Sequence, residues 1–96
     1  MSKKGYWLVM LTVIDPEGYQ RYRDAIGDAI TKFGGRYLVR GGQVTNPEGS
    51  EFSRHVAVEF DSYDTALACY RSSTYQEALK HRVASSTGHF AIVEGV

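Results

Sequence analysis

The segment from Phe33 to Gly42 constrains the fold of this chain more than any other. Two glycine pairs, at positions 34–35 and 41–42, bracket a short run in which Arg36 and Arg40 alternate with aromatic and aliphatic residues. Glycine adopts the left-handed conformation that ends many helices, and alternating side chains lie on opposite faces of a strand. The segment therefore predicts a helix end, a strand over Arg36–Arg40 with one charged face, and a turn.

The remaining apolar runs predict three more strands and two helices. Tyr6–Ile14 is rich in β-branched and aromatic residues, as a buried strand is. Asp15 and Pro16 favour a helix start, because aspartate caps free backbone N–H groups and proline is tolerated in the first turn. After the second strand we expect a strand over Ser53–Phe60 and a helix from Asp61 that is interrupted at Ser72–Ser73. A further helical piece, capped by Ser73, should run through Thr74 to about His81. A connector over Ala84–Gly88 and a strand over His89–Glu94 follow.

The order β-α-β-β-α-β predicts one α+β domain of the ferredoxin-like class over residues 1–96. In that plan, two helices cover one face of a four-stranded antiparallel sheet, the third strand lies between the first and the second, and the fourth lies beside the first. The first strand, however, is apolar on both faces. We therefore expect a second copy of the chain to cover the open face, which predicts a homodimer.

Composition narrows the classes of partner. Eleven lysines and arginines balance eleven aspartates and glutamates, so the chain lacks the net positive charge typical of nucleic-acid binders. No apolar run is long enough to span a membrane. We expect neither nucleic acid nor membrane as a partner.

The cysteine and histidine content predicts neither a disulfide nor a metal site. Cys69 is the only cysteine, which fits a reducing, cytoplasmic location and a buried, inert thiol. The histidines show no spacing typical of metal ligands, so we expect no metal and no cofactor. Haem held by His81 or His89 is an alternative.

The second and third predicted strands should pair as a hairpin. A loop centred near Pro47 and Glu48 would place Arg36 opposite Glu59, Leu38 opposite Ala57 and Arg40 opposite His55, with Tyr37, Val39, Val56, Val58 and Phe60 on the other face. The charged residues are then either cross-strand pairs that stabilise the hairpin or a polar patch in an apolar cavity.

In the second interpretation, arginine would hold an anion or an enolate while histidine or glutamate moves a proton. The catalytic candidates are Arg40, His55 and Glu59. The candidate ligand-binding residues are Arg36, Arg40 and Tyr70, the last because its hydroxyl could point into a cavity between helix and sheet.

The chain resembles the small bacterial proteins grouped as domain of unknown function 1330. The resemblance covers nearly the whole chain and rests on these residues: Gly5-Tyr6-Trp7, Asp15-Pro16, Tyr19, Tyr22, the run from Gly34 to Gly42, Glu59-Phe60, Ala66, Tyr70, Tyr75, Arg82 and Glu94-Gly95. It implies a ferredoxin-like protomer that pairs into a dimeric α/β barrel. It transfers no catalytic assignment, and Arg40 matches a position of the family pattern without a role.

Two functions are therefore expected. The first is a small-molecule-binding protein or small enzyme of the proton-transfer or cofactor-free oxygenation type, with its pocket between sheet and helices. The alternative is a non-catalytic homodimeric module with a structural or stress-related role, in which the arginines only pair strands.

Overall fold

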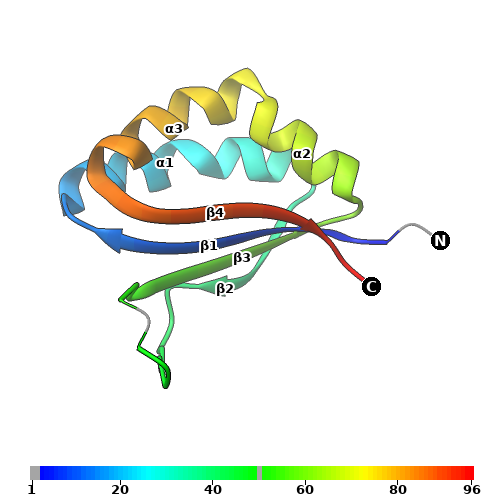
Figure 1. Cartoon of the computed structure of the whole chain (residues 1–96). Coiled ribbons are helices and arrows are strands. Elements are labelled where there is room, and N and C mark those ends of the chain that lie inside the picture. Colours follow the sequence, from blue (N-terminus) through cyan, green and yellow to red (C-terminus); the bar gives the residue numbers. More distant parts are fainter. Residues whose placement is uncertain (1–2, 50) are drawn as a thin grey trace.

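The computed structural model describes residues 3–49 and 51–96. One four-stranded antiparallel sheet carries all of the helices on one of its faces, as Figure 1 shows. The elements are β1 (Gly5–Val13), α1 (Pro16–Lys32), β2 (Arg36–Arg40), β3 (Arg54–Phe60), α2 (Tyr63–Arg71), α3 (Ser73–Ser85) and β4 (Ser86–Glu94). Among the described residues, no helix is both long and apolar enough to cross a bilayer.

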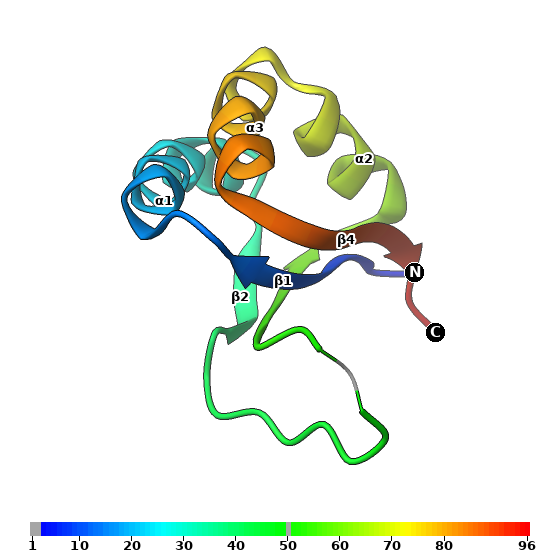
Figure 2. The same ribbon diagram turned by 60° about the vertical axis from the view of Figure 1, so that its left-hand side comes forward.

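The strand order is β2-β3-β1-β4, so the predicted α+β, ferredoxin-like fold is confirmed. β3 lies between β1 and β2, and β4 pairs with the other side of β1. The turned view in Figure 2 separates the helices on one side of the sheet from the long connection between β2 and β3 on the other. The two faces of the sheet therefore have different surroundings.

Helix α1 buries the stripe that its apolar spacing predicts. Tyr19, Tyr22 and Ile26 are buried against the sheet. Asp15 occupies the N-cap position, but its side chain makes no capping hydrogen bond; its backbone carbonyl accepts from the Tyr19 N–H at 3.0 Å. The helix ends before Gly34, whose φ of 70° is the left-handed conformation that favours glycine.

The predicted break in the second helical region is confirmed, but its cap is one residue earlier than expected. The hydroxyl of Ser72, not Ser73, accepts a hydrogen bond from the Tyr75 N–H and so begins α3. The expected connector over Ala84–Gly88 is absent, because α3 runs to Ser85 and β4 begins at Ser86. The hydroxyl of Ser85 donates to the His81 carbonyl and that of Ser86 to the Arg82 carbonyl, at 2.6 and 2.7 Å, which satisfies the last turn.

Aromatic side chains dominate the core between sheet and helices. Trp7 is 2% exposed, its indole N–H donates to the Ala66 carbonyl at 2.9 Å, and its ring packs against Phe60, Tyr75 and Phe90 with centroids 4.9–5.2 Å apart. Such tilted contacts suit the ring quadrupoles. The Trp7 side chain, on the helix-facing side of β1, is therefore buried in the core.

The hairpin register agrees with the prediction at one end and differs at the other. Arg36 lies opposite Glu59 as expected, but Val39, not Leu38, faces Ala57, and Arg40 faces Val56 and not His55. The cause is an irregularity between Tyr37 and Val39, at which Leu38 is an extra residue without a partner. This β-bulge turns Arg40 to the helix side and Val39 to the open side, which residue alternation alone does not predict.

The central part of the sheet's open face is apolar, and none of the described helices covers it. Leu8, Met10 and Val39 are 45%, 38% and 44% exposed. They border a hollow of about 440 Å³ together with His55, His89 and Ala91. The apolar second face of β1 that the sequence predicts is therefore present and uncovered in the single chain.

Candidate functional site

A small cavity lies between the sheet and α1, on the helix side. Its free space is about 20 Å³, room for about one water molecule. Aromatic rings line much of it: Trp7, Tyr19, Tyr22, Tyr37 and Phe90. Three guanidinium groups, those of Arg23, Arg40 and Arg54, complete the wall, and we call this space the arginine cavity.

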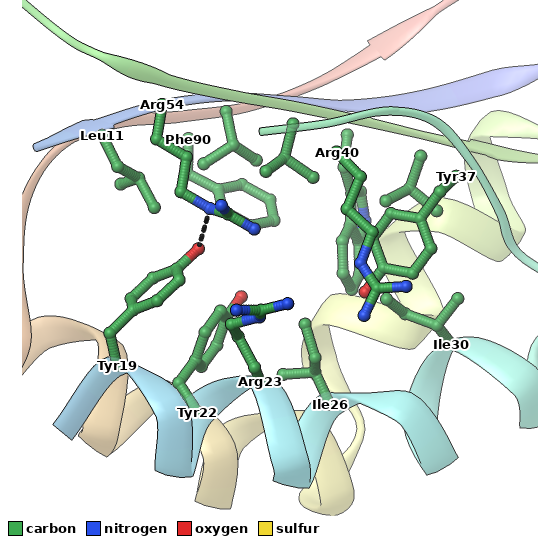
Figure 3. Close-up of a pocket in the computed structure, with 14 residues that line it drawn as sticks. Leu11, Tyr19, Tyr22, Arg23, Ile26, Ile30, Tyr37, Arg40, Arg54 and Phe90 are labelled. Atoms are coloured by element: carbon green, nitrogen blue, oxygen red, sulfur yellow. Dashed lines mark hydrogen bonds between the residues drawn. The ribbon is translucent and has the colours of Figure 1, made fainter. Parts of the chain in front are cut away.

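The arginines reach the cavity from three different elements. Figure 3 shows Arg40 and Arg54 pointing from β2 and β3 toward α1, and Arg23 pointing from α1 toward the same space. Arg23 follows Tyr19 by four residues and precedes Ile26 by three, so helical spacing places it on the flank of the buried stripe. Arg23 and Arg40 are exposed, whereas Arg54 is half-buried.

Tyrosine rings hold two of these side chains in place. The Arg40 guanidinium lies over the Tyr37 ring, 4.4 Å from its centroid, and that of Arg54 lies 5.2 Å from the centroid of Tyr19. Arg54 Nε also donates to the Tyr19 hydroxyl at 3.0 Å. Within the described residues, Arg40 makes no hydrogen bond and Arg54 makes only this one, so most of their N–H groups stay available.

Gly41 leaves the room that Arg54 occupies. A Cβ atom at position 41 would collide with the Arg54 guanidinium, and the φ of Gly41 is 67°. Its N–H donates to the His55 carbonyl at 2.8 Å, which closes this end of the hairpin. Thus Gly41, the first residue of the second glycine pair, has a role at the site as well as in the turn.

None of the three arginines has a carboxylate partner within residues 3–49 and 51–96. The ion pairs found there join Lys4 to Asp61, Arg36 to Glu59, and Lys80 to Glu77. No histidine and no carboxylate lines the cavity in this part of the chain. The cavity is therefore equipped to hold negative charge, and a proton acceptor does not face it.

A tyrosine pair lies behind the cavity. The hydroxyls of Tyr22 and Tyr75 are 2.9 Å apart and share a hydrogen bond. Burial raises the pKa of Tyr22 well above its ordinary value and also raises the pKa of Tyr75, so both stay neutral near neutral pH. Arg82 lies over the rings of Tyr22 and Phe90, at 6.0 and 5.1 Å, and its buried Nε has no hydrogen-bond partner among the described atoms.

The sequence-predicted candidates are divided between the two faces of the sheet. Arg40 lines the arginine cavity, whereas Arg36, His55 and Glu59 lie on the open face. Arg36 Nε donates to Glu59 Oε1 at 2.7 Å, and the Tyr6 hydroxyl donates to Glu59 Oε2 at 2.9 Å. The hydrogen bonds from Arg36 and then Tyr6 lower the pKa of the Glu59 carboxyl.

The structure separates the remaining candidates from the cavity as well. His55 Nε2 lies 3.3 Å from the Phe52 carbonyl. Tyr70 packs on Tyr75 and Phe90, each with centroids 5.1 Å apart, and is not part of the cavity wall. His81 lies on α3 and His89 on β4, and no cluster of three potential metal ligands occurs in the described part of the chain.

Sequence reasoning missed Arg23 and Arg54 as site residues. Arg54 alternates with Val56 and Val58, so it stands on the apolar, helix-facing side of β3. The signal that could have identified Arg54 was its position among the alternate residues of β3 that are otherwise apolar. Arg23 gave a weaker signal, since charged residues often flank a buried helical stripe.

Solved structures with the same fold have diverse descriptions. A protein of unknown function from Rhodopseudomonas palustris is 18% identical, with a TM-score of 0.80 over 100% of this chain and 85% of that one. SnoaB, a cofactor-independent oxygenase from Streptomyces nogalater, is 9% identical, with a TM-score of 0.61 over 96% and 92%. A dimeric, ferredoxin-like protein of unknown function from Bacteroides fragilis is 14% identical, with a TM-score of 0.56 over 95% of each chain.

A match to a sequence family assigns the chain more specifically than its structural similarity to other proteins does. No curated protein matches the chain in sequence. The family model described as Domain of unknown function (DUF1330) matches residues 4–96, which include every residue of the arginine cavity. The chain therefore belongs to the DUF1330 family, as its resemblance predicted.

Proposed function

We propose that this protein binds a small organic molecule in the arginine cavity. The observation that carries the proposal is the convergence of three guanidinium groups, without carboxylate partners among the described residues, on one aromatic-lined space. Ligand sites are typically apolar hollows with a few converging polar groups. Purely structural arginines would be expected to pair with carboxylates, as Arg36 does with Glu59.

The reaction class that we propose is cofactor-free oxygenation or proton transfer on an enolisable or phenolic compound. Among proteins with this fold, SnoaB is described as a cofactor-independent oxygenase. Both reaction types pass through an organic anion, and preorganised donors stabilise such charge in a water-poor site. In this proposal Arg40 and Arg54 stabilise the anion. A substrate that ionises readily suits a cavity wall that holds no histidine or carboxylate among the described residues.

We also propose that the working form is a homodimer in the cytoplasm. The uncovered apolar face with Leu8, Met10 and Val39 supports a second copy as its cover. A ferredoxin-like protein from Bacteroides fragilis is described as dimeric, which supports a dimer for this fold. The same face favours the alternative function, a non-catalytic dimeric module, because that function needs the interface alone.

A ligand screen separates these functions. Thermal unfolding would be followed with a panel of phenols and enolisable ketones, and oxygen consumption measured for each compound that stabilises the protein. We expect stabilisation that Arg40→Gln removes and that Arg21→Gln keeps, since Arg21 is an exposed α1 residue outside the cavity. If no compound stabilises the protein while it sediments as a dimer, the module is the better account.

A further inference from the structure

We infer that the arginine cavity is specific for organic acids, with a carboxylate held by Arg40 and Arg54 and a flat apolar body packed among the aromatic rings. This inference rests on the proposed function and adds the chemical class of the ligand. It follows from three features of the cavity: free guanidinium edges, uncompensated charge and limited space.

The donor geometry favours a planar oxyanion. The Arg40 guanidinium lies over the Tyr37 ring, and that of Arg54 lies at the hydroxyl end of Tyr19, 5.2 Å from the ring centroid. Arg54 uses Nε for the Tyr19 hydroxyl, which leaves its two terminal nitrogens free of protein partners in the described residues. A guanidinium fork matches the two oxygens of a carboxylate in a bidentate pair. The tyrosines therefore orient the forks without occupying them.

The charge around the cavity is uncompensated. The whole chain has equal numbers of acidic and basic residues, yet the guanidiniums of Arg23, Arg40 and Arg54 point into one space that no described carboxylate enters. Like charges near one another repel more strongly where protein displaces water. An incoming anion would remove that repulsion and gain hydrogen bonds at the same time, so neutral molecules of the same shape should bind more weakly.

The space within the cavity favours a small head group. About 20 Å³ is free, room for about one water molecule, so side chains must move before any head group enters, and a flat carboxylate requires less movement than a bulkier tetrahedral phosphate. The apolar body needs more room than this. Arg23 is exposed and can swing outward, since side-chain rotamers commonly change on binding. The body would then lie against Tyr22, Ile26 and Phe90, which line the cavity.

Paired ligands test the inference. Benzoate, cinnamate and 1-naphthoate would each be titrated calorimetrically into the full chain beside the corresponding primary amide, which has the same shape without the charge. At least one acid should bind about tenfold more tightly than its amide, the factor expected for a charge-assisted pair. Arg40→Gln and Arg54→Gln should each remove most of that preference, and Arg40→Lys should restore part of it because the charge returns without the fork.

The controls make each outcome decisive. Arg21→Gln should keep the preference for the acid over its amide. Circular dichroism would verify that every variant is folded. Because Arg40 is exposed, its variants test the inference even if Arg54→Gln unfolds. Equal binding of acids and amides would overturn the inference but not the proposed function. Binding of neutral phenols alone would have the same two consequences. Tighter binding of phenyl phosphate than of any acid overturns the carboxylate assignment. Binding of none of these compounds, charged or neutral, overturns the proposed function as well.

Discussion

The guanidinium of Arg40 lies 4.4 Å from the centroid of the Tyr37 ring, although the two residues are three apart on one strand. In a regular strand, such residues lie on opposite faces. The bulge at Leu38 brings them to the same face, whereas Arg36 stays on the other face with Glu59. One five-residue strand thus supplies an arginine to each side of the sheet.

Gly41→Ala should destabilise the protein and displace Arg54. The residue has a φ of 67°, and its new Cβ would collide with the Arg54 guanidinium. The left-handed backbone alone costs an alanine about 1–2 kcal/mol. Urea unfolding would measure the change in free energy. Gly42→Ala is the matched control, because that position has no positive φ and open space around it, and an equal loss in both variants would contradict the assignment.

Glu59 should make stability depend on acid pH. The hydrogen bonds from Arg36 and Tyr6 hold the pKa of this carboxyl below its ordinary value of 4.5 in the folded protein. The stabilisation is therefore complete above about pH 4.5 and is lost as the pH falls through the lower, folded pKa. Glu59→Gln should flatten that decline in the free energy of unfolding, measured with urea between about pH 3 and 6. A decline in Glu59→Gln as steep as in the parent protein would refute this origin.

The Tyr22 and Tyr75 hydroxyls should be energetically coupled. Their buried hydrogen bond is 2.9 Å long. Tyr75→Phe leaves the Tyr22 hydroxyl unpaired, at a cost of about 1–3 kcal/mol, and Tyr22→Phe removes the same hydrogen bond from Tyr75. The double variant should lose less than the sum of the two, and a double-mutant cycle by urea unfolding measures the difference. Tyr63→Phe, at an exposed position, is the control; additive losses would contradict the coupling.

Cys69 should be chemically inert in the folded protein. The thiol is 0% exposed, its Sγ lies 3.6 Å from the Ala29 carbonyl, and burial raises its pKa to about 12. Only thiolates react readily with disulfide reagents, so at about pH 8 the native protein should react only as fast as it unfolds. The rate at which a chromogenic disulfide reagent modifies Cys69 would be measured by absorbance, with and without urea. Rapid modification of the native state would show that the side chain is accessible.

Leu8→Lys should separate the proposed dimer. Leu8 lies on the open face of the central strand β1, where a charge would have to be buried if a second copy packs there. Sedimentation should give twice the 10.7 kDa of one chain for the parent protein and a single chain for the variant. Val83→Lys, at an apolar position on α3 that is 65% exposed against 45% for Leu8, should stay dimeric. A parent protein that sediments as one chain would disprove the interface.

Local patterns predicted the elements and their order, since helix spacing at Tyr19, Tyr22 and Ile26 and alternation in β3 depend on near neighbours. Two other features depend on more than such patterns. The hydroxyls of Ser85 and Ser86 donate to carbonyls of α3, and these hydrogen bonds extend the helix through a segment whose composition indicates a loop. The bulge at Leu38 depends on how β2 pairs with β3, so Arg40 could be chosen from the sequence as a candidate while its partners could not.

The bulge also sets what this strand tolerates in evolution. Between Tyr37 and Val39 the gene encodes one more residue than the opposite strand can pair. Losing the Leu38 codon would leave a regular ladder with Arg36 and Arg40 facing as they do now. Losing a codon from β3 between Val56 and Glu59 would instead turn one end of that strand over, because the partners there are paired one to one with β1. Within these two paired strands, length variation among descendants of this gene should therefore be confined to β2, and it would leave the two arginines on opposite sides of the sheet.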